Sequence, residues 1–513
     1  MPHDTQAQRL LISKYNRRQV CSNRLRRLQF RKRKKTRFVF IARDLSAEQL
    51  SREKTANLGI LNAERVPGHV PGTLFKHTGK YMSKEFDVNT KVNFPPNTVC
   101  RDVDDYHIVI APEYPNWIVL DDQEYEIFRI LSENTIIDGL NEYYAAFPEN
   151  TEDDCILAFT DFLAKVEDCQ FYGDVEFEEE EPVEAIKKKV HITMTNNCNM
   201  RCPHCFVSAG IVEKQELKVE EILAVVERIK EINGLTDIVV SGGEPLIHSG
   251  TIQLLKGLKG HNVTLFTNGT LINEKNYEAI AECCQEVQIS FEGVTQKPYE
   301  KIRGKGNYAK ALHAIDLLKT TGIKITLAIT ILPSTVEDIR DNLISFVDSF
   351  DYKNLEIRLN DDIEMTGNAL TMNFTGFNKY EVDKLMISLV SQLQDRGVSK
   401  ASSSGRNVQF KNCGIGTNIV IDANGRIYPC NKFSSYYRSP AEDMEQIFRD
   451  FNELNRKTST DYLARCRKCE LRYICAGGCR IDYMNRHGDM LAVDCTPEFK
   501  ENQYRKLLLD YLE

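Results

Sequence analysis

Three cysteines, Cys198, Cys202 and Cys205, constrain this chain more than any other feature of its sequence. They follow residues 190–194, whose alternating apolar and polar side chains predict a short β-strand. The cysteines are therefore expected on the loop beyond the C-terminal end of that strand, where parallel α/β folds place their active sites. A closed structural site usually takes four protein ligands, so three thiols predict a metal centre with one open coordination position. A structural zinc loop with a distant fourth ligand and a set of buried free thiols are the alternatives.

Strand-like and helix-like segments alternate over residues 190–365, which is the pattern of parallel βα units. The segments 219–232 and 308–318 are predicted helices, because their apolar residues recur on one helical face. Six predicted strands suit an α/β fold with a partial (β/α)6 TIM-like barrel better than a closed barrel of eight strands. The strands are expected at residues 190–194, 237–241, 263–267, 286–291, 323–331 and 355–359.

The composition is typical of a soluble protein with several domains. A chain of 513 residues with 42% hydrophobic residues suits about three domains. It contains neither an apolar run of membrane-spanning length nor a secretory signal, so we expect a cytoplasmic protein with no membrane partner. Its sixteen cysteines are then not expected to form disulfides. Ten of them have metal-ligand spacing, and the other six are interpreted as ordinary thiols: Cys21, Cys100, Cys155, Cys169, Cys283 and Cys284.

Residues 1–100 form a basic and poorly defined N-terminal region. Residues 1–40 hold thirteen Lys or Arg and one acidic residue, which leaves about −20 for the remainder of a chain with a net charge of −8. We favour a solvated tail over a segment that docks nucleic acid or an acidic peptide. Residues 41–100 show no sustained hydrophobic period.

Residues 101–173 predict a small winged-helix-like module of two strands and three helices. The strands are expected at 106–110 and 117–120, and the helices at 122–131, 135–144 and 152–166. This pattern loosely resembles the PqqD-like domains that hold the leader of a precursor peptide against a strand edge, where main-chain hydrogen bonds recruit an extended peptide. A generic winged helix with a structural or nucleic-acid role is the alternative. A charged linker with a proline break is predicted at residues 174–189.

The stretch Ser-Gly-Gly-Glu-Pro at residues 241–245 follows the second predicted strand of the barrel. Paired glycines let the backbone approach a ligand, and a carboxylate at the C-terminal end of a strand can receive an amino group. Together with the preceding Cys-x3-Cys-x2-Cys triplet, this order resembles the radical S-adenosylmethionine (SAM) enzymes. The resemblance implies a four-iron four-sulfur cluster on Cys198, Cys202 and Cys205, whose fourth iron binds the amino and carboxylate groups of SAM. An electron from the cluster then cleaves SAM to methionine and a 5′-deoxyadenosyl radical.

The same resemblance implies a set of residues that contact SAM, while no catalytic residue is assigned. Gly242, Gly243 and Glu244 match the segment that holds the methionine amino group. His204 stands where an aromatic residue that packs on the adenine is common. The weaker matches are Thr267 and Asn268 beside the sugar, Ser290 with Arg303 at the ribose or carboxylate, and Leu332 near the adenine.

Seven further cysteines lie in the C-terminal third of the chain. An Asn-Gly pair at residues 424–425 predicts a β-hairpin with Cys413 and Cys430 on its two flanks. A zinc ribbon is the alternative for four cysteines. The order of all seven resembles the SPASM extension of radical SAM enzymes that modify peptides and proteins, which implies two auxiliary iron–sulfur clusters. One cluster would take Cys466, Cys469, Cys475 and Cys495, and the other would take Cys413, Cys430 and Cys479.

The second auxiliary set is one ligand short of four. Fully ligated relatives carry another cysteine about six residues before the position of Cys413, where this chain has Asn407. Either another residue or water completes the site, or an iron is open to a substrate thiolate. We assign residues 366–405 to a bridging segment and residues 406–513 to the SPASM domain with its auxiliary clusters.

These features predict a radical SAM/SPASM maturase of a ribosomally synthesised peptide. The N-terminal module would hold the leader segment of the precursor peptide, and an external donor such as flavodoxin or ferredoxin would reduce the enzyme. Auxiliary clusters that take up the electron imply a net two-hydrogen oxidation, such as a thioether, carbon–carbon or carbon–oxygen cross-link, with epimerisation as an alternative.

Two other functions compete with this prediction. Formylglycine-forming sulfatase maturases resemble the chain in both cysteine sets, but they usually carry Asp after the cysteine matched by Cys430. Asn431 stands there in this chain, and an amide cannot act as a general base. A non-catalytic iron–sulfur or zinc scaffold that binds nucleic acid is the alternative from another class, and it has no need of motifs for SAM.

Overall fold

The computed structural model describes residues 86–512 apart from 180, 212–213, 235–236, 362, 364–365, 375–376, 400–405 and 433–434. The predictions for the basic tail and for Cys21 lie outside these residues. The described chain forms two compact units, a smaller one of residues 86–90 and 135–164 and a larger one of residues 91–134 and 165–512. The strands and helices predicted between residues 101 and 173 are therefore divided between the two units.

The smaller unit contains helix α3 (Ile136–Ala146) and most of helix α4 (Glu152–Asp168). Both helices were predicted, and both are present. The Thr135 hydroxyl caps α3 by accepting a hydrogen bond from the amide of Asp138 at 3.2 Å. Tyr143 packs against Phe147 and Phe159, with ring centroids 4.6 and 5.5 Å away. This aromatic group forms the core of the unit.

The larger unit begins with a three-stranded antiparallel sheet, β1 (Val99–Val103), β2 (Tyr106–Ala111) and β3 (Asn116–Leu120), followed by α2 (Asp122–Glu133). The prediction covers β2, β3 and α2 but misses β1. One face of the sheet packs against the C-terminal helix α15 (Pro497–Leu512). The packed residues of the sheet are Val103, Ile108, Ile110, Trp117 and Val119, and their partners are Leu471, Tyr504, Leu507 and Leu508.

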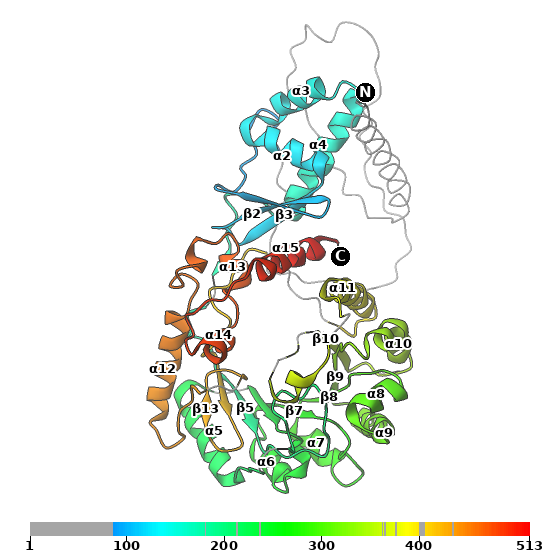
Figure 1. The fold of residues 1–513 in the computed structure, drawn as a ribbon, viewed down its shortest axis with the longest axis vertical. Coiled ribbons are helices and arrows are strands. Elements are labelled where there is room, and N and C mark those ends of the chain that lie inside the picture. Colours follow the sequence, from blue (N-terminus) through cyan, green and yellow to red (C-terminus); the bar gives the residue numbers. More distant parts are fainter. Residues whose placement is uncertain are drawn as a thin grey trace, which may run out of the picture. The chain divides into compact units, whose positions relative to one another are not determined.

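A largely parallel sheet of eight strands forms the centre of the larger unit, in the order β10-β9-β8-β7-β6-β5-β12-β13. Its six barrel strands confirm the six that were predicted, and helices cover the outer face of the sheet (Figure 1). Apolar residues alternate along each strand, so one side of every strand packs under those helices. The strands are β5 (Lys189–Thr193), β6 (Asp237–Ser241), β7 (Asn262–Thr267), β8 (Glu286–Ser290), β9 (Lys324–Thr330) and β10 (Leu355–Asn360). The helices are α5 (Val219–Asn233), α6 (Thr251–Gly257), α7 (Tyr277–Cys283), α8 (Gln296–Arg303), α9 (Asn307–Lys319) and α10 (Val336–Asp348).

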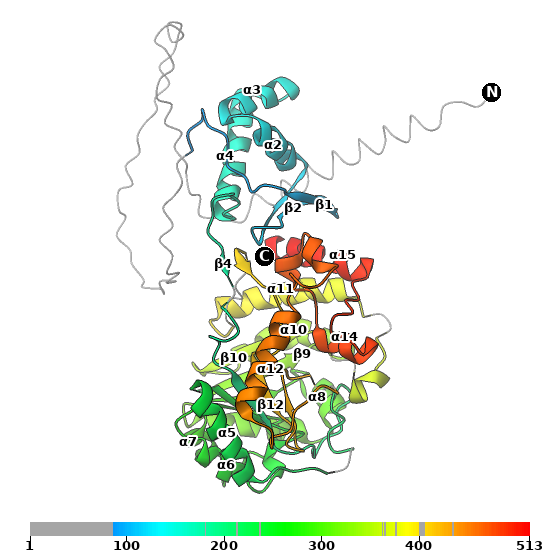
Figure 2. The ribbon, with the colours of Figure 1, turned by 90° about the vertical axis from the view of Figure 1, so that its left-hand side faces the viewer.

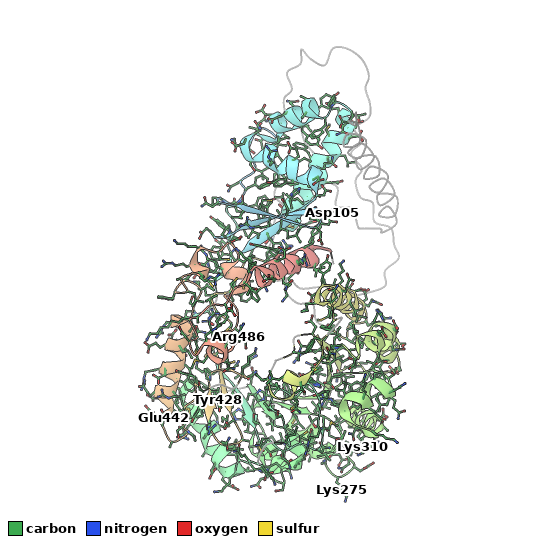
Figure 3. The ribbon with its side chains drawn as sticks, viewed as in Figure 1. Asp105, Lys275, Lys310, Tyr428, Glu442 and Arg486 are labelled. Carbon is green, nitrogen blue, oxygen red and sulfur yellow. The ribbon has the colours of Figure 1, made fainter. Side chains whose placement is uncertain are left out.

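The last two strands of this sheet come from the C-terminal third of the chain. β12 (Asn418–Ile421) pairs in parallel with β5, and β13 (Ile427–Tyr428) turns back antiparallel on β12. Gly425 takes a φ of 80° in the turn, which confirms the predicted Asn-Gly hairpin. Tyr428, labelled in Figure 3, donates its hydroxyl to Asp422 at 3.0 Å and braces this turn. The hairpin thereby joins the C-terminal third of the chain to the barrel sheet.

The remaining elements complete the C-terminal part of the larger unit. Helix α12 (Met444–Lys457) packs beside α5, and the polypeptide after it folds into short helices and turns that together contain five of the seven C-terminal cysteines (Figure 2). None of the helices in the described part of the chain is long and apolar enough to cross a membrane. The other elements are β4 (Glu178–Glu179), which pairs with β11 (Val408–Gln409), the helices α11 (Lys379–Asp395), α13 (Arg472–Cys475) and α14 (Arg480–His487), and the 3-10 helices η1 (Pro245–Ile247), η2 (Gly367–Thr371) and η3 (Cys466–Lys468).

Candidate functional site

The cysteine loop, residues 194–211, leaves the C-terminal end of β5 and carries the three thiols of the triplet. Burial raises the pKa of the Cys202 thiol to about 11, and the neighbouring Cys198 and Cys205 add to the rise. The backbone amides of Met200 and Ala209 donate to the sulfurs of Cys198 and Cys205, at 3.4 and 3.3 Å. Such N–H donors favour thiolates and, where a cluster is bound, help to set its potential. The loop therefore brings three thiols together and supports them with backbone donors.

The paired glycines after β6 lie directly against the cysteine loop. The amides of Gly243 and Glu244 donate to the carbonyl oxygens of Thr195 and Asn197, at 2.7 and 2.9 Å. A Cβ atom on Gly243 would lie 2.3 Å from the oxygen of Asn197, and one on Gly242 would lie 2.8 Å from that of Thr195. Both positions require glycine, because a side chain at either would push the cysteine loop away.

Glu244 is fully buried and joins this segment to the loop after β7. Its carboxylate accepts hydrogen bonds from the Thr267 hydroxyl and the Asn268 amide, both at 2.7 Å, and from the Leu246 amide at 3.1 Å. Burial raises the pKa of Glu244, and these donors oppose the rise. Three residues predicted to contact SAM, Glu244, Thr267 and Asn268, thus form one hydrogen-bonded group.

Asn199, which the sequence did not single out, connects that group to the cysteines. The amide nitrogen of Asn268 donates to Asn199 Oδ1 at 2.9 Å, and Asn199 in turn donates to the Thr270 hydroxyl at 2.9 Å. The same nitrogen of Asn268 lies 4.0 Å from the sulfur of Cys198. In the sequence, only the position of Asn199 directly after Cys198 indicated that it could connect the Glu244 group to the cysteines.

Arg303 is buried and forms a bidentate ion pair with Glu292. Burial by itself would raise the pKa of Glu292, but the Arg303 guanidinium, helped by His204, lowers that pKa to about 2. His204 Nε2 lies 3.4 Å from the Glu292 carboxylate. Arg303 was predicted to act with Ser290, whereas its partner is Glu292, two residues further along the same motif. The sequence analysis quoted Glu292 inside that motif but gave it no role.

Ser290 and Leu332 lie at the same end of the sheet as the cysteine loop. Ser290 is the last residue of β8 and is half-buried, while Leu332 follows β9 and is fully buried. The strands β5, β8 and β9 belong to the parallel part of the sheet, so their C-terminal ends lie along one edge. All nine predicted SAM contacts therefore gather at this edge.

A cavity of about 300 Å³ opens beside the cysteine loop. Phe206 and Gly243 line it from the barrel, and Asp422, Asn424 and Lys432 line it from the hairpin region of the C-terminal third. Its volume is at the lower end of the range for small-molecule sites. The cavity thus touches both the cysteine loop and the segment that carries Cys430.

Four C-terminal cysteines, here called the four-cysteine set, line a single hollow: Cys466, Cys469, Cys475 and Cys495. Burial raises the pKa of Cys466 to about 11, and the positive charge of Arg480 opposes the rise. Glu470, next to Cys469, is buried and accepts hydrogen bonds from Arg101 on β1, from Tyr504 at 2.5 Å and from Lys500 at 2.9 Å. These contacts join the four-cysteine set to the N-terminal sheet and to α15.

The other three C-terminal cysteines, Cys413, Cys430 and Cys479, are the three-cysteine set. Burial raises the pKa of Cys430 to about 11, and the proximity of Cys479 and Cys413 adds to the rise. The backbone amide of Lys432 donates to the sulfur of Cys430 at 3.2 Å. The structure therefore groups the seven C-terminal cysteines into the same two sets that the resemblance implied.

Asn407, which stands where relatives carry a fourth cysteine, uses its side chain in hydrogen bonds to other residues. Its side-chain oxygen accepts a hydrogen bond from Asn116 on β3 at 3.0 Å, and its side-chain nitrogen donates to Gln170 at 3.2 Å. The backbone of Asn407 has a positive φ of 59°, and its amide donates to the carbonyl of Pro115 at 2.8 Å. These contacts tie Asn407 to the N-terminal sheet.

Arg480 is fully buried and holds the turn between the two cysteine sets. Its guanidinium donates to the carbonyl oxygens of Thr458 at 2.8 Å, Ala476 at 2.9 Å, Gly477 at 2.8 Å and Gly478 at 2.6 Å. The three turn residues all have positive φ values of 54°, 75° and 78°. Arg480 satisfies four carbonyl groups that this strained turn would otherwise leave without donors.

The residues present fit the cofactors that the resemblance implies. Three thiols with supporting amides are the donor set of a cluster that keeps one iron open. His204 Nδ1 is buried and has no hydrogen-bond partner among the residues that the structure describes, so it is available to a ligand. The cavity beside Gly243 provides space next to the cysteine loop.

A parallel α/β sheet with a cysteine triplet and a Gly-Gly-Glu segment at its carboxyl edge is the arrangement that the resemblance to radical SAM enzymes implies. Residues 192–346 match the radical SAM superfamily. This part of the chain is therefore a radical SAM domain, and the protein is a radical SAM enzyme with SAM and an iron–sulfur cluster as cofactors.

Three known proteins illustrate what the chain is similar to. GTP 3′,8-cyclase of Petrotoga mobilis is 26% identical over 41% of this chain and 68% of its own length. The subtilosin biosynthesis protein AlbA of Bacillus subtilis is 24% identical over 51% of this chain and 57% of its own length. The structure of SuiB from Streptococcus suis bound to S-adenosylmethionine covers 79% of this chain and 99% of SuiB, with a TM-score of 0.50 and 15% identity. At this identity the likeness to SuiB concerns the fold alone.

Proposed function

We propose that the protein is a radical SAM maturase that modifies a ribosomally synthesised peptide. The observation that carries the SAM-dependent part is the hydrogen-bonded group in which Glu244, Thr267 and Asn268 join the glycine segment to the cysteine loop. With a four-iron cluster and SAM bound there, the site supplies a 5′-deoxyadenosyl radical that abstracts a hydrogen atom from the substrate. Arg303, buried and charged beside Glu292, provides a fixed positive charge in the same site.

The seven C-terminal cysteines support a SPASM-type domain with two auxiliary clusters. Each set gathers thiols from separate segments of the chain, and in neither set do three of the described sulfurs all lie within 4.8 Å of one another. A single zinc ion with Zn–S bonds of about 2.3 Å needs its thiolates closer than that, whereas a cluster places several irons between them. We therefore propose three four-iron clusters in all, the first on Cys198, Cys202 and Cys205.

A four-iron cluster on Cys413, Cys430 and Cys479 would keep one iron without a cysteine ligand. Asn407 is held by Asn116 and Gln170, so it offers no free amide to an iron. Asp482, three residues after Cys479, is paired with Lys432 at 2.9 Å. We propose that this iron is open to water or to a substrate thiolate, which sulfur-binding iron accepts readily.

The free edge of the N-terminal sheet supports a peptide substrate. On the outer side of β3, the carbonyl oxygens of Trp117 and Val119 already accept hydrogen bonds from Arg406 and Lys165. At the other edge of the sheet, no described strand pairs with the outer side of β1. We propose that the leader segment of the precursor peptide adds to β1 as a fourth strand, through main-chain hydrogen bonds.

AlbA supports the peptide substrate, because it is named for the biosynthesis of a bacteriocin and matches a longer part of this chain than GTP 3′,8-cyclase does. The predicted outcome is an oxidative cross-link, thioether, carbon–carbon or carbon–oxygen. The auxiliary clusters would take up the electron, and an external donor such as flavodoxin or ferredoxin would reduce the enzyme. A formylglycine-type reaction on a protein substrate is less well supported, because Asn431 stands in place of the expected Asp base and shares a hydrogen bond with His191.

Two experiments test the proposal. Anaerobic reconstitution should give about twelve irons per chain, and dithionite with SAM should then yield 5′-deoxyadenosine. Zinc in place of iron, without cleavage of SAM, would refute the radical reaction. Co-expression with each short peptide encoded next to the gene, read by mass spectrometry, should give a peptide with a mass loss of two hydrogens. A peptide that is neither bound nor modified would refute the maturase function.

Matched variants at Asp102 test the docking edge. The register of the sheet turns the amide of Asp102 away from β2, so Asp102→Pro removes a donor from the outer edge without breaking the existing ladder. Asp102→Ala keeps the amide. We expect the Pro variant to lose peptide binding and the Ala variant to keep it. Equal binding by both variants would place the leader elsewhere.

A further inference from the structure

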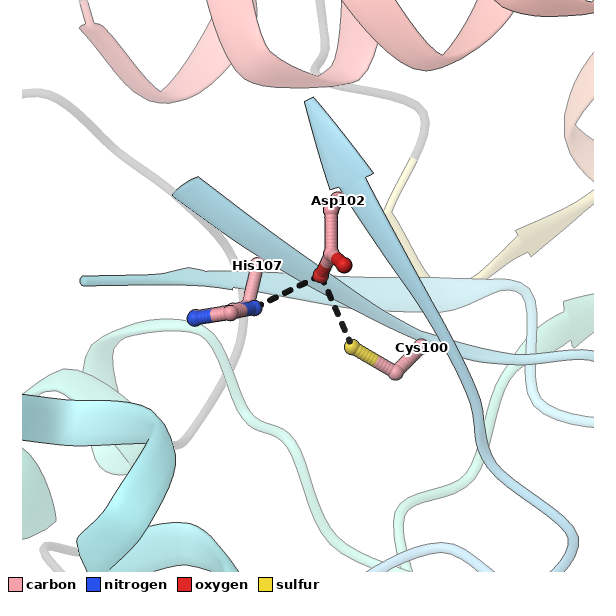
Figure 4. Close-up of side chains that lie close together, drawn as sticks. All are labelled: Cys100, Asp102 and His107. Carbon is pink, nitrogen blue, oxygen red and sulfur yellow. Dashed lines mark hydrogen bonds and ion pairs between the residues drawn. The ribbon is translucent and has the colours of Figure 1, made fainter. Parts of the chain in front are cut away.

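Three potential metal ligands meet on the β1–β2 hairpin, outside the cysteine sets described above. Cys100 and Asp102 stand on one face of β1, and His107 stands opposite Asp102 on β2 (Figure 4). One ligand atom from each of the three lies within 4.8 Å of the others. The sequence analysis interpreted Cys100 as an ordinary thiol, because Asp102 and His107 become its neighbours only through the pairing of the two strands.

The hydrogen bonds of His107 prepare its ring as a metal ligand. Its Nδ1 lies 2.7 Å from Asp102 Oδ1, and its Nε2 lies 3.1 Å from Asp122 Oδ1 at the start of α2. Carboxylates only accept, so a zinc ion bound at Nδ1 would replace the hydrogen bond to Asp102, while Asp122 would keep the Nε2 proton and orient the ring. The ring also stacks on Tyr125, with centroids 4.2 Å apart, so its orientation is held from a second side.

We propose that Cys100, Asp102 and His107 bind a zinc ion, with Asp122 as the outer carboxylate that orients His107. Thiolate, carboxylate and imidazole are all ligands that zinc accepts, and three protein ligands leave a fourth position for water. Binding releases the Cys100 proton and the His107 Nδ1 proton to solvent, and the ion neutralises the charges of the thiolate and the Asp102 carboxylate.

The distances are close to those that a tetrahedral ion requires. Bonds of about 2.0–2.3 Å place neighbouring ligand atoms about 3.3–3.6 Å apart. The Asp102–His107 pair at 2.7 Å would open slightly, and the Cys100–Asp102 pair at 4.0 Å would close slightly. Side-chain rotation is sufficient for both changes, since the Asp102 side chain is 78% exposed.

The ion would cross-link the two arms of the hairpin next to their turn. β1 is the edge strand, and only its last residue, Val103, is buried, while Arg101 and Asp102 are exposed. A cross-link at Asp102 and His107 would hold β1 in register with β2. This inference does not depend on the proposed reaction or on its peptide substrate.

Zinc retention by the full-length protein tests the site. The wild type and its variants are first reconstituted with iron and sulfide, then equilibrated with zinc and a competing chelator, and both metals are counted per chain. Cys100→Ser and His107→Ala should each lose one zinc with an unchanged iron count. Cys169→Ser is the matched control, because Cys169 is a half-buried thiol of the same unit outside this group, and it should keep the zinc.

Two further measurements separate this site from zinc in the cysteine sets. X-ray absorption at the zinc edge should show one sulfur at about 2.3 Å and the remaining ligands at about 2.0–2.2 Å. Asp122→Asn should weaken zinc binding about 10- to 100-fold while all three ligands stay in place. Equal zinc retention by the wild type and Cys100→Ser, or a zinc environment of three or four sulfurs, would overturn the proposal.

Discussion

Substituting Gly243 with alanine tests the packing that places the cysteine triplet. The added Cβ atom would lie 2.3 Å from the carbonyl oxygen of Asn197, where an ordinary contact is 3.4 Å or more. The glycine segment and the cysteine loop must therefore separate by about 1 Å. The hydrogen bond from the Gly243 amide to Thr195, 2.7 Å in the native chain, would stretch or break with this movement.

The expected result is a large loss of SAM cleavage with a smaller loss of iron. A displacement of about 1 Å between reacting groups costs about 100-fold in rate, and the thiols of the loop move with their backbone. Formation of 5′-deoxyadenosine under dithionite should therefore fall by about that factor, while the iron of the two C-terminal sets stays bound. Iron analysis and timed product assays under anaerobic conditions measure both quantities.

Gly257→Ala is the matched control. Its Cβ atom would lie 2.8 and 2.9 Å from the two terminal methyl groups of Leu223, which can rotate away, and Gly257 ends helix α6 far along the chain from the cysteine loop. This variant should cleave SAM at the native rate. If Gly243→Ala also cleaves SAM within twofold of the native rate, the close contact does not position the thiols and the reasoning fails.

Three further variants test the buried charges. Arg480→Lys removes most of the donors to the turn between the cysteine sets. We expect the free energy of unfolding in urea to fall by about 3 kcal/mol and the four-cysteine set to lose iron. A native iron count would contradict this role of Arg480. The pKa of Glu470 is lowered to about 2, because hydrogen bonds from Tyr504 and Lys500 outweigh its burial. The ionised carboxylate therefore stabilises the fold fully above about pH 4.5, and this stabilisation is lost as the pH falls toward 2. Glu470→Gln should lower the free energy of unfolding by about 2 kcal/mol at pH 7 and by progressively less in acid, and a loss independent of pH would contradict the assignment. Glu292→Gln leaves the Arg303 cation buried without a counter-charge, so its unfolding free energy should fall by about 3–5 kcal/mol, and the double variant with Arg303→Met should recover much of it.

The barrel strands and the cysteine triplet could be predicted because their signals are local. Each barrel strand is a short apolar run between turn residues, and the three cysteines of the triplet lie within residues 198–205. The grouping of the seven C-terminal cysteines came from the family resemblance, because those residues are far apart in the chain. Strand β1 was missed because Arg101 and Asp102 interrupt its apolar pattern. Its pairing with β2 and its contacts with α15 and Glu470 stabilise it instead.

The contacts that support the site could not be predicted, because they join segments far apart in the chain. Glu292 and Asn199 are polar residues inside loops, and the sequence does not reveal that they pair with Arg303 and Asn268. Arg480 is one of many arginines until the fold buries it against four carbonyl groups. Their roles arise from burial, where an unpaired polar group is costly and its partner is therefore specified.

The sequence by itself determined the chemistry of this protein: three thiols at a strand end, a Gly-Gly-Glu segment one βα unit later, and seven further cysteines. These features are contained in the order and spacing of residues along the chain. The tertiary structure alone decided how these parts are joined, because β12 pairs with β5 and attaches the C-terminal third to the barrel sheet. It alone also placed Cys100 beside His107, since a strand ladder joins residues across a turn according to register.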